Sequence, residues 1–299
     1  MDLDAREFQD GRPGPMKPAP FHYHSPGTEG EALALLAKFA PEEGRILAGG
    51  QSLIPAMALR VARPAHLVDI GGIAGFDRLT VEDGWLRIRP CVRHAALGTE
   101  AVPGPLGALL ETLRGQIAHL PIRTRGTFCG SLANADPASE WCLLAATLGS
   151  SMLLRSLRGG REIAGENFFQ GFMTTALDPD EMLVEVRLPL LADTVRTGFF
   201  EFSRRAGDYA QAAALAVLEL RDGAIVAPRL GLGAVEDRPR RLAVAEAVLE
   251  GRVPSSALFR EAAAAARAAL VPMDEDPYRL DLAQTVIHRA LAAATGVAE

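Results

Sequence analysis

Two stretches rich in glycine and small polar residues dominate this sequence: LAGGQSL at residues 47–53 and GTFCGSLANADP at residues 126–137. Glycine lets the backbone approach a ligand closely and adopt positive φ, and successive N–H groups in such turns form anion-binding concavities. Two such turns, one from each half of a domain, could hold the two phosphates of a dinucleotide. The alternative, which the residues alone leave open, is that both are ordinary tight turns.

Neither glycine turn has the spacing of a known nucleotide-binding fingerprint. No GxGxxG lies between a predicted strand and a predicted helix, so a Rossmann site is not supported. The chain has no GxxxxGK[ST] and no lysine after Lys38, which excludes a P-loop. A dinucleotide that binds here therefore binds in another way.

The composition is that of a folded, acidic protein. Of the 299 residues 48% are hydrophobic, and the net charge of 31 − 37 = −6 disfavours a nucleic-acid partner. No apolar run is long enough to cross a bilayer, and the N-terminus lacks the pattern of a secretory signal. We therefore expect a cytoplasmic protein with no membrane span.

Cysteine and histidine usage argues against a metal centre in this chain. Cys91, Cys129 and Cys142 are too few for a disulfide scaffold or for the four ligands of an iron–sulfur cluster. The six histidines are scattered, and no pair has metal-ligand spacing with a cysteine or carboxylate. We predict no metal site and assign no catalytic side chain.

The N-terminal part of the chain predicts a small strand–helix–strand unit. Residues 1–15 are polar and without periodicity, so we expect a disordered extension, with Met16 as a candidate original start. Thr28 and Glu31 predict a capping box at the start of an apolar helical stripe. Short buried strands are expected at 45–48 and 66–70.

The middle of the chain predicts a second unit around the later glycine turn. Residues 123–140 show neither helical nor strand periodicity, whereas Asp136 and Pro137 predict the N-cap and first position of a helix. Apolar periodicity predicts a strand around 86–88, a helix over 106–117, and strands over 152–157 and 182–188.

The last third predicts a separate α+β domain after a boundary near residues 189–197. Three apolar runs separated by turn residues predict a three-stranded antiparallel sheet, at 198–202, 212–220 and 224–235. Helices are expected over 241–249, 257–270 and 280–294.

These motifs resemble the FAD-binding medium subunits of the molybdenum hydroxylases, the family that includes xanthine dehydrogenase and carbon-monoxide dehydrogenase. The resemblance is carried by AGGQSLIP at 48–55, TFCGSLANADPASE at 127–140, RRAGDYAQAAA at 204–214 and the opening MKPAPFHYHSP at 16–26. It covers roughly residues 16–296.

The resemblance implies an α+β protein of two parts. The first is a two-subdomain FAD-binding fold of the vanillyl-alcohol-oxidase (PCMH) type over 16–192, with subdomains of about 16–72 and 73–192. The second is a C-terminal α+β domain over 193–299, with a three-stranded antiparallel sheet and helices, which would cover the flavin and help to dock partners.

The resemblance also implies a set of cofactor-binding residues for non-covalent FAD. The family's first pyrophosphate loop is matched by Ala48, Gly49, Gly50, Gln51, Ser52 and Leu53, and its second by Thr127, Cys129, Gly130 and Ser131. The ribose and adenine side is matched by Asn134, Asp136 and Glu140, and the flavin ring by Leu183 and Tyr209.

Two departures from the family pattern affect this site. The family often has Ile-Gly where this chain has Phe128 and Cys129, so a positive φ at Cys129 would be strained. A redox role for Cys129 is one interpretation, and a small apolar filler is the other. Some members carry a lysine near Glu201 that touches the cofactor; because this residue is acidic, that contact is not carried over.

The function implied is that of an electron-transfer subunit. A large partner would hold a molybdenum–pterin centre, a small partner two two-iron–two-sulfur clusters, and FAD here would pass electrons to NAD, a quinone or oxygen. The expected assembly is a dimer of heterotrimers. A free-standing FAD-dependent oxidase and a flavin-free scaffold subunit are the alternatives. The substrate and the electron acceptor stay open.

Overall fold

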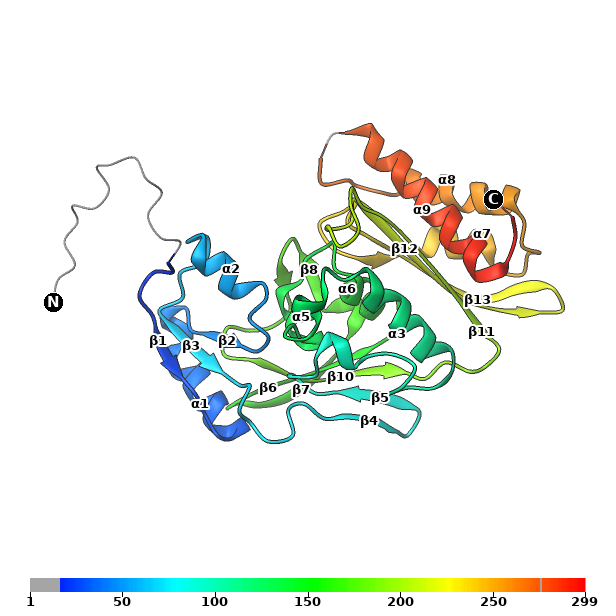
Figure 1. Ribbon diagram of the computed structural model, residues 1–299. Coiled ribbons are helices and arrows are strands. Elements are labelled where there is room, and N and C mark those ends of the chain that lie inside the picture. Colours follow the sequence, from blue (N-terminus) through cyan, green and yellow to red (C-terminus); the bar gives the residue numbers. More distant parts are fainter. Residues whose placement is uncertain (1–16, 275, 299) are drawn as a thin grey trace.

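The computed structural model describes residues 17–274 and 276–298, and Figure 1 shows the arrangement of their helices and strands. The N-terminal lobe lies at one end of the molecule and the C-terminal domain at the other, with a larger sheet and its helices between them (Figure 1). The predicted disordered extension at 1–15 and the candidate start at Met16 lie outside the described residues.

A parallel three-stranded sheet in the order β1-β3-β2 forms the N-terminal lobe. Its strands are β1 (His22–His24), β2 (Arg45–Leu47) and β3 (His66–Asp69). Helix α1 (Glu29–Phe39) begins with the predicted capping box, because the Glu31 N–H donates to Thr28 Oγ1 and the Thr28 N–H donates to Glu31 Oε2, both at 3.2 Å. Strand β2 was expected to be buried but is an edge strand, with Arg45 exposed.

The largest sheet is antiparallel, in the order β4-β5-β10-β6-β7. Its strands are β4 (Leu79–Glu82), β5 (Trp85–Ile88), β6 (Ser151–Ser156), β7 (Gly159–Ala164) and β10 (Met182–Pro189). In β5 the side chains of Leu86 and Ile88 are fully buried while Trp85 and Arg87 are half-exposed, which confirms the predicted alternation.

Short helices, turns and a hairpin connect these sheets. The helices are α2 (Leu53–Ala58), α3 (Gly104–Gln116), α4 (Leu120–Arg123), α5 (Phe128–Asn134) and α6 (Glu140–Leu148). The hairpin strands are β8 (Phe169–Gly171) and β9 (Thr174–Thr175), and single 3-10 turns span Ala40–Glu42, His94–Ala96 and Gly165–Asn167.

Two predictions about residues 123–140 were wrong. This stretch showed no helical or strand period in the sequence, but it contains α5, a helix of seven residues that buries Phe128, Cys129 and Leu132. The N-cap of α6 is Ser139, whose Oγ accepts the Cys142 N–H at 3.4 Å, and not Asp136. The Asp136 carboxylate instead accepts the Ala138 N–H at 2.9 Å, in a turn that precedes the helix.

The C-terminal domain pairs an antiparallel sheet with three helices. The strands are β11 (Val195–Phe202), β12 (Ala212–Arg221), β13 (Ala224–Gly233) and β14 (Arg240–Arg241), and the helices are α7 (Ala243–Leu249), α8 (Ser256–Ala268) and α9 (Pro277–Thr295). The predicted sheet of three strands is therefore a sheet of four. The fourth, β14, has two residues and is too short to show any periodicity.

Helix α6 joins the central sheet to the C-terminal domain (Figure 1). It is buried from Trp141 to Leu148 and packs against β12 and β13. A β-carbon at Gly231 of β13 would lie 1.9 Å from Thr147 Oγ1, so glycine is what allows this close approach. One buried cluster contains Trp141 together with Leu215 of β12, so the hydrophobic core is continuous across the two parts.

Candidate functional site

The first glycine turn lies between β2 and α2. Gly50 has φ of +70°, a conformation that favours glycine, and Gln51 Nε2 donates to Gly49 O at 3.1 Å. The first intrahelical bond runs from the Ile54 N–H to Gly50 O. In the described part of the chain the N–H groups of residues 51–53 have no protein acceptor, so the turn presents a row of free donors.

The second glycine turn forms the start of α5. Thr127 is its N-cap, and Thr127 Oγ1 accepts the Gly130 N–H at 3.1 Å. The Phe128 N–H donates to Val92 O at 3.0 Å. Among residues 17–274 and 276–298, the N–H groups of Thr127 and Cys129 find no backbone acceptor. This turn therefore also offers unpaired donors at a helix start.

The two turns, far apart in sequence, are in direct contact. A β-carbon at Gly49 would lie 2.6 Å from Arg125 O, 2.8 Å from Gly126 Cα and 2.9 Å from Thr127 N. These neighbours are backbone atoms and cannot rotate away. Glycine at position 49 is thus required for the two rows of amides to meet.

Hydrogen bonds of a buried histidine and a buried tryptophan hold the backbone of the second turn in place. The His94 N–H donates to Gly126 O at 3.0 Å, and Trp141 Nε1–H donates to His94 Nδ1 at 2.9 Å. Burial lowers the pKa of His94 to about 4, so the ring is neutral and accepts this bond. Sequence reasoning missed both residues, because a lone histidine and a lone tryptophan carry no motif.

Two of the predicted site residues are buried in the core. Cys129 is 3% exposed, and its Sγ lies 3.6 Å from the carbonyl oxygens of Ile88 and Arg89. Burial strongly raises the pKa of this thiol, which fits the small apolar filler and not a reactive thiolate. Cys129 lies inside α5 and does not have a positive φ, so the backbone strain considered from the sequence is absent. Leu183 of β10 is 5% exposed in the same cluster.

The remaining predicted residues gather near the start of α6. Asn134 ends α5, and Ser131 O accepts from the Cys142 thiol at 3.5 Å, which holds α6 against α5. Burial is the main cause that raises the pKa of the Tyr209 hydroxyl, and the negative charges of Asp136 and Glu140 raise it further. These three side chains are therefore neighbours. Burial likewise raises the pKa of Asp136, and burial with the nearby Glu201 raises that of Glu140 to about 8.

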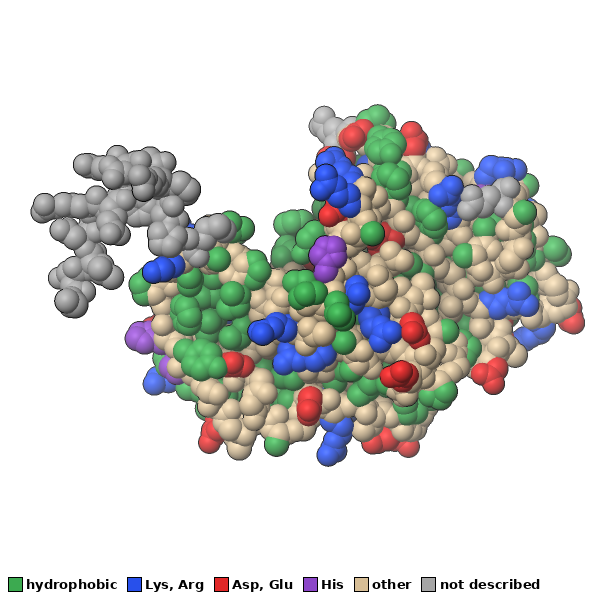
Figure 2. Space-filling model, viewed as in Figure 1, with side chains coloured by type: hydrophobic (Ala, Val, Ile, Leu, Met, Phe, Trp, Pro, Cys, Tyr) green, Lys and Arg blue, Asp and Glu red, His purple; other side chains and the backbone are tan. Residues whose placement is uncertain are grey.

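Tyr209 belongs to the loop between β11 and β12 and is 71% exposed. With Arg204, Gly207, Asp208 and Gln211 it lines a hollow. A β-carbon at Gly207 would lie 2.8 Å from His119 Cε1, so this loop lies over the start of α4. Figure 2 shows the surface hollowed between the N-terminal lobe and the C-terminal domain, with basic side chains gathered on the face below.

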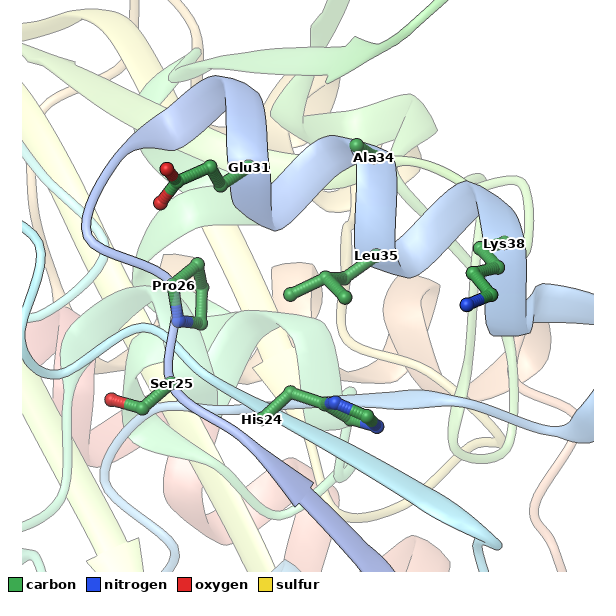
Figure 3. A pocket seen from close by; sticks show the side chains of 7 residues that line it. All are labelled: His24, Ser25, Pro26, Glu31, Ala34, Leu35 and Lys38. Atoms are coloured by element: carbon green, nitrogen blue, oxygen red, sulfur yellow. The ribbon is translucent and has the colours of Figure 1, made fainter.

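A second, open groove lies in the N-terminal lobe, between β1 and α1. Figure 3 shows its lining side chains, His24, Ser25, Pro26, Glu31, Ala34, Leu35 and Lys38. The Glu31 carboxylate is already used by the N–H groups of Gly27 and Thr28. The groove contains none of the residues of the glycine turns and is separate from the site they form.

Within 17–274 and 276–298 no group of three or more His, Cys, Asp or Glu residues could hold a metal ion. In the same part of the chain no helix has the length and apolar character needed to span a membrane.

Two family models together match most of the chain. One, described as the FAD binding domain in molybdopterin dehydrogenase, matches residues 19–191. The other, described as the CO dehydrogenase flavoprotein C-terminal domain, matches residues 198–294. Both glycine turns fall within the first match.

Known proteins of similar sequence and structure are subunits of multi-subunit dehydrogenases and hydroxylases. The chain is 35% identical to the caffeine dehydrogenase subunit beta of Pseudomonas sp. (strain CBB1), over 93% of this chain and 96% of that one. It is 34% identical to the nicotine 6-hydroxylase medium subunit of Paenarthrobacter nicotinovorans, over 93% and 99%. A reconstituted CO dehydrogenase chain from Oligotropha carboxidovorans superposes with a TM-score of 0.89 at 32% identity, over 94% and 99%.

Proposed function

This chain belongs to the FAD-binding medium subunits of the molybdenum hydroxylase family, and we propose that its two glycine turns grip the diphosphate of one FAD molecule. The observation that carries the proposal is the backbone contact at Gly49, which brings the amides of residues 51–53 next to those of Thr127 and Cys129. Backbone donors suit a diphosphate because they add positive dipoles without side-chain entropy.

The residues present fit a bound dinucleotide. Three glycines shape the two turns: a β-carbon at Gly49 would collide with the backbone of the second turn, Gly50 has φ of +70°, and a β-carbon at Gly130 would lie 2.6 Å from Thr127 Oγ1. We assign the diphosphate contacts to residues 48–53 and to Thr127, Cys129, Gly130 and Ser131. Asn134, Asp136 and Glu140 are assigned to the ribose and adenine side, and Leu183 and Tyr209 to the flavin ring.

In the proposed function FAD carries the electrons, and this chain binds and orients it. When bound, FAD can accept electrons singly and release them in pairs, so it links one-electron and two-electron partners. The residues of this chain bind and orient it: the turns fix its diphosphate, and the side chains near Glu140 set the charge around it. Cys91, Cys129 and Cys142 are buried and one short of the four ligands that a two-iron–two-sulfur cluster takes.

We therefore place the other redox centres in partner subunits. A large subunit would hold the molybdenum–pterin centre and a small one the two iron–sulfur clusters, in a dimer of heterotrimers in the cytoplasm. An external acceptor would take electrons from this chain. We also propose the domain boundaries 16–192, with subdomains of about 16–72 and 73–192, and 193–299. One of the three hydrophobic clusters lies wholly within 193–299, whereas the other two cross the boundaries at 72/73 and 192/193.

The experiment that tests the FAD site is a spectrum of the purified full-length chain. The wild-type chain is expected to carry FAD or to take it up in equimolar amount. Gly130→Val is expected to lose it, because a β-carbon there would lie 2.6 Å from Thr127 Oγ1, so the branched side chain must displace the backbone that carries the Thr127 and Cys129 donors. Gly72→Val is the matched control, since nothing lies within 4 Å of its added β-carbon.

The same variants separate the alternatives. A flavin-free scaffold subunit would assemble with its partners and support full activity in the Gly130→Val form. A free-standing oxidase would oxidise an organic donor as an isolated chain. A colourless wild-type chain that binds no added FAD contradicts the proposal directly.

A further inference from the structure

The turn of the hairpin β8–β9 exposes two large apolar side chains at its tip. Phe172 is 63% exposed and Met173 is 43% exposed. The turn is ordered, because Thr174 Oγ1 donates to Phe172 O at 2.9 Å. Met173 has φ of +52°, a backbone conformation that glycine adopts at lower cost than a residue with a β-carbon. Two adjacent apolar side chains held in the open on an ordered turn form a candidate binding surface.

The hairpin tip contacts a residue that is assigned to the FAD site. The Met173 sulfur lies 4.0 Å from Asn134 Nδ2, and Asn134 is the last residue of α5. Strand β9 also packs against α5, and Figure 1 shows the hairpin beside that helix, between the N-terminal lobe and the C-terminal domain. Helix α5 begins at the second glycine turn and has seven residues, so the tip lies roughly 10 Å from that turn along the helix.

The loop that follows β13 ties the hairpin to the connection between α5 and α6. Arg238 Nη1 donates to Gln170 O of β8 at 2.8 Å. In the same loop the Ala234 N–H donates to Pro137 O at 2.8 Å. These bonds from the C-terminal domain hold the hairpin and residues 134–137 in a fixed relation to each other.

The loop that carries Tyr209 is joined to the same connection. Arg279 Nη1 donates to Gln211 O at 3.3 Å, near the end of that loop, and to Ala234 O at 2.8 Å. Tyr209 is 71% exposed. The hairpin tip and Tyr209 thus both expose apolar surface close to residues 134–137.

The side chains at the tip suit a flat ring and not an anion. A phenyl ring and a thioether have no strong hydrogen-bond donor, and both pack well on the faces and edges of aromatic systems. FAD has two such ring systems, isoalloxazine and adenine, one on each side of its diphosphate. A diphosphate held at the start of α5 therefore leaves one ring within reach of the other end of that helix, where the tip lies.

We propose that Phe172 and Met173 pack against one of the two rings of bound FAD, so that the hairpin β8–β9 is a third element of the cofactor site beside the two glycine turns. This inference rests on the proposed FAD site and adds two residues to it. The contribution of the hairpin is apolar contact: the ligand covers the phenyl ring and the thioether, and they in turn fix the position of the ring. No electron or proton passes through the hairpin.

The test measures the dissociation constant for FAD of the full-length chain by flavin fluorescence. Phe172→Ala is expected to raise it about 10-fold or more, because the contact area and stacking of one aromatic ring are lost. Phe172→Tyr keeps the ring and is expected to bind FAD like the wild type. Leu157→Ala is the matched control and should change nothing, since Leu157 is also 63% exposed, in the turn between β6 and β7. Thermal melts without FAD should be the same for all four chains.

Two further measurements on the same chains identify the ring. If the tip contacts isoalloxazine, Phe172→Ala shifts the visible absorption band of bound FAD and leaves the affinity for ADP, measured by competition, unchanged. If the tip contacts adenine, Phe172→Ala weakens ADP and FAD by the same factor and leaves the flavin band in place. Either result supports the inference.

A Phe172→Ala chain with wild-type affinities for FAD and ADP and an unshifted flavin band would overturn the inference while leaving the FAD site intact. That outcome is the one expected if the tip contacts a partner protein and not the cofactor. A wild-type chain that binds no FAD would instead refute the proposed function.

Discussion

The two glycine turns meet at one point but are built in opposite ways. In the second turn the residues at 126–129 are all buried, and His94, Trp141 and Val92 O hold the backbone in place. In the first turn Ser52 is exposed, and α2 buries only Met57 among its six residues. The second turn is therefore part of the hydrophobic core, whereas the first is a loop laid against it.

This difference bears on the entropy that the proposed FAD site loses when the ligand binds. The core fixes one half permanently, and the other half is positioned by contact with its backbone at Gly49. In the proposed FAD site both halves are thus in place before the ligand binds, which reduces the entropy lost on binding. Substitutions in the two halves should consequently have different signatures: the first should change FAD affinity, and the second should change stability as well.

The largest effect is expected at the contact between the halves. In Gly49→Val the added side chain meets the backbone at Arg125 O and Thr127 N, so the turns must separate. We expect the FAD dissociation constant to rise at least about 1,000-fold, or about 4 kcal/mol, while the melting temperature without FAD changes little. Isothermal titration and thermal melts measure the two quantities. Gly72→Val should leave both unchanged, and tight FAD binding by Gly49→Val would show that the turns do not act together.

The next effect concerns the buried brace of the second turn. His94 is buried and neutral, with its pKa lowered from 6.5 to about 4 by burial and by the Arg93 charge. The unfolded chain binds this proton first, so the stabilisation is complete above about pH 6.5 and is lost as pH falls toward 4. The free energy of unfolding should drop over this window by up to about 3 kcal/mol from this group.

Denaturant unfolding of His94→Gln measures that contribution. Glutamine retains an acceptor for Trp141 but does not titrate, so its stability should fall less steeply with acid than that of the wild type. His22→Gln, at an exposed histidine of β1, should keep the wild-type slope. Equal slopes for all three chains would mean that His94 does not support the turn in its neutral form.

Sequence reasoning succeeded where a residue pattern is set by local geometry. The capping box of α1 was found because Thr28 and Glu31 bond to each other's backbone three residues apart. The alternation in β5 was found because one face of that strand is buried and the other is not. Family resemblance supplied the cofactor and the role, which periodicity alone did not provide.

It failed where tertiary contacts decide the structure. Helix α5 has only seven residues, of which Phe128, Cys129 and Leu132 are buried, so it is too short for its existence to be read from periodicity. Asp136 looked like an N-cap, but Ser139 takes that place and Asp136 forms the preceding turn. His94 supports the second turn through burial beside Trp141, a residue distant in sequence.

The smallest effect separates the two functions of Thr127, which caps α5 and presents a free N–H at the cradle. Thr127→Ala removes the oxygen that accepts the Gly130 N–H at 3.1 Å, and loss of such a cap costs about 1 kcal/mol of stability. Thr127→Ser keeps the oxygen and should restore most of it, as measured by denaturant unfolding. Because the backbone donors survive in both variants, FAD affinity should fall less than in Gly49→Val. A Thr127→Ala chain as stable as Thr127→Ser would mean that the core alone, without the cap, holds the second turn in its shape.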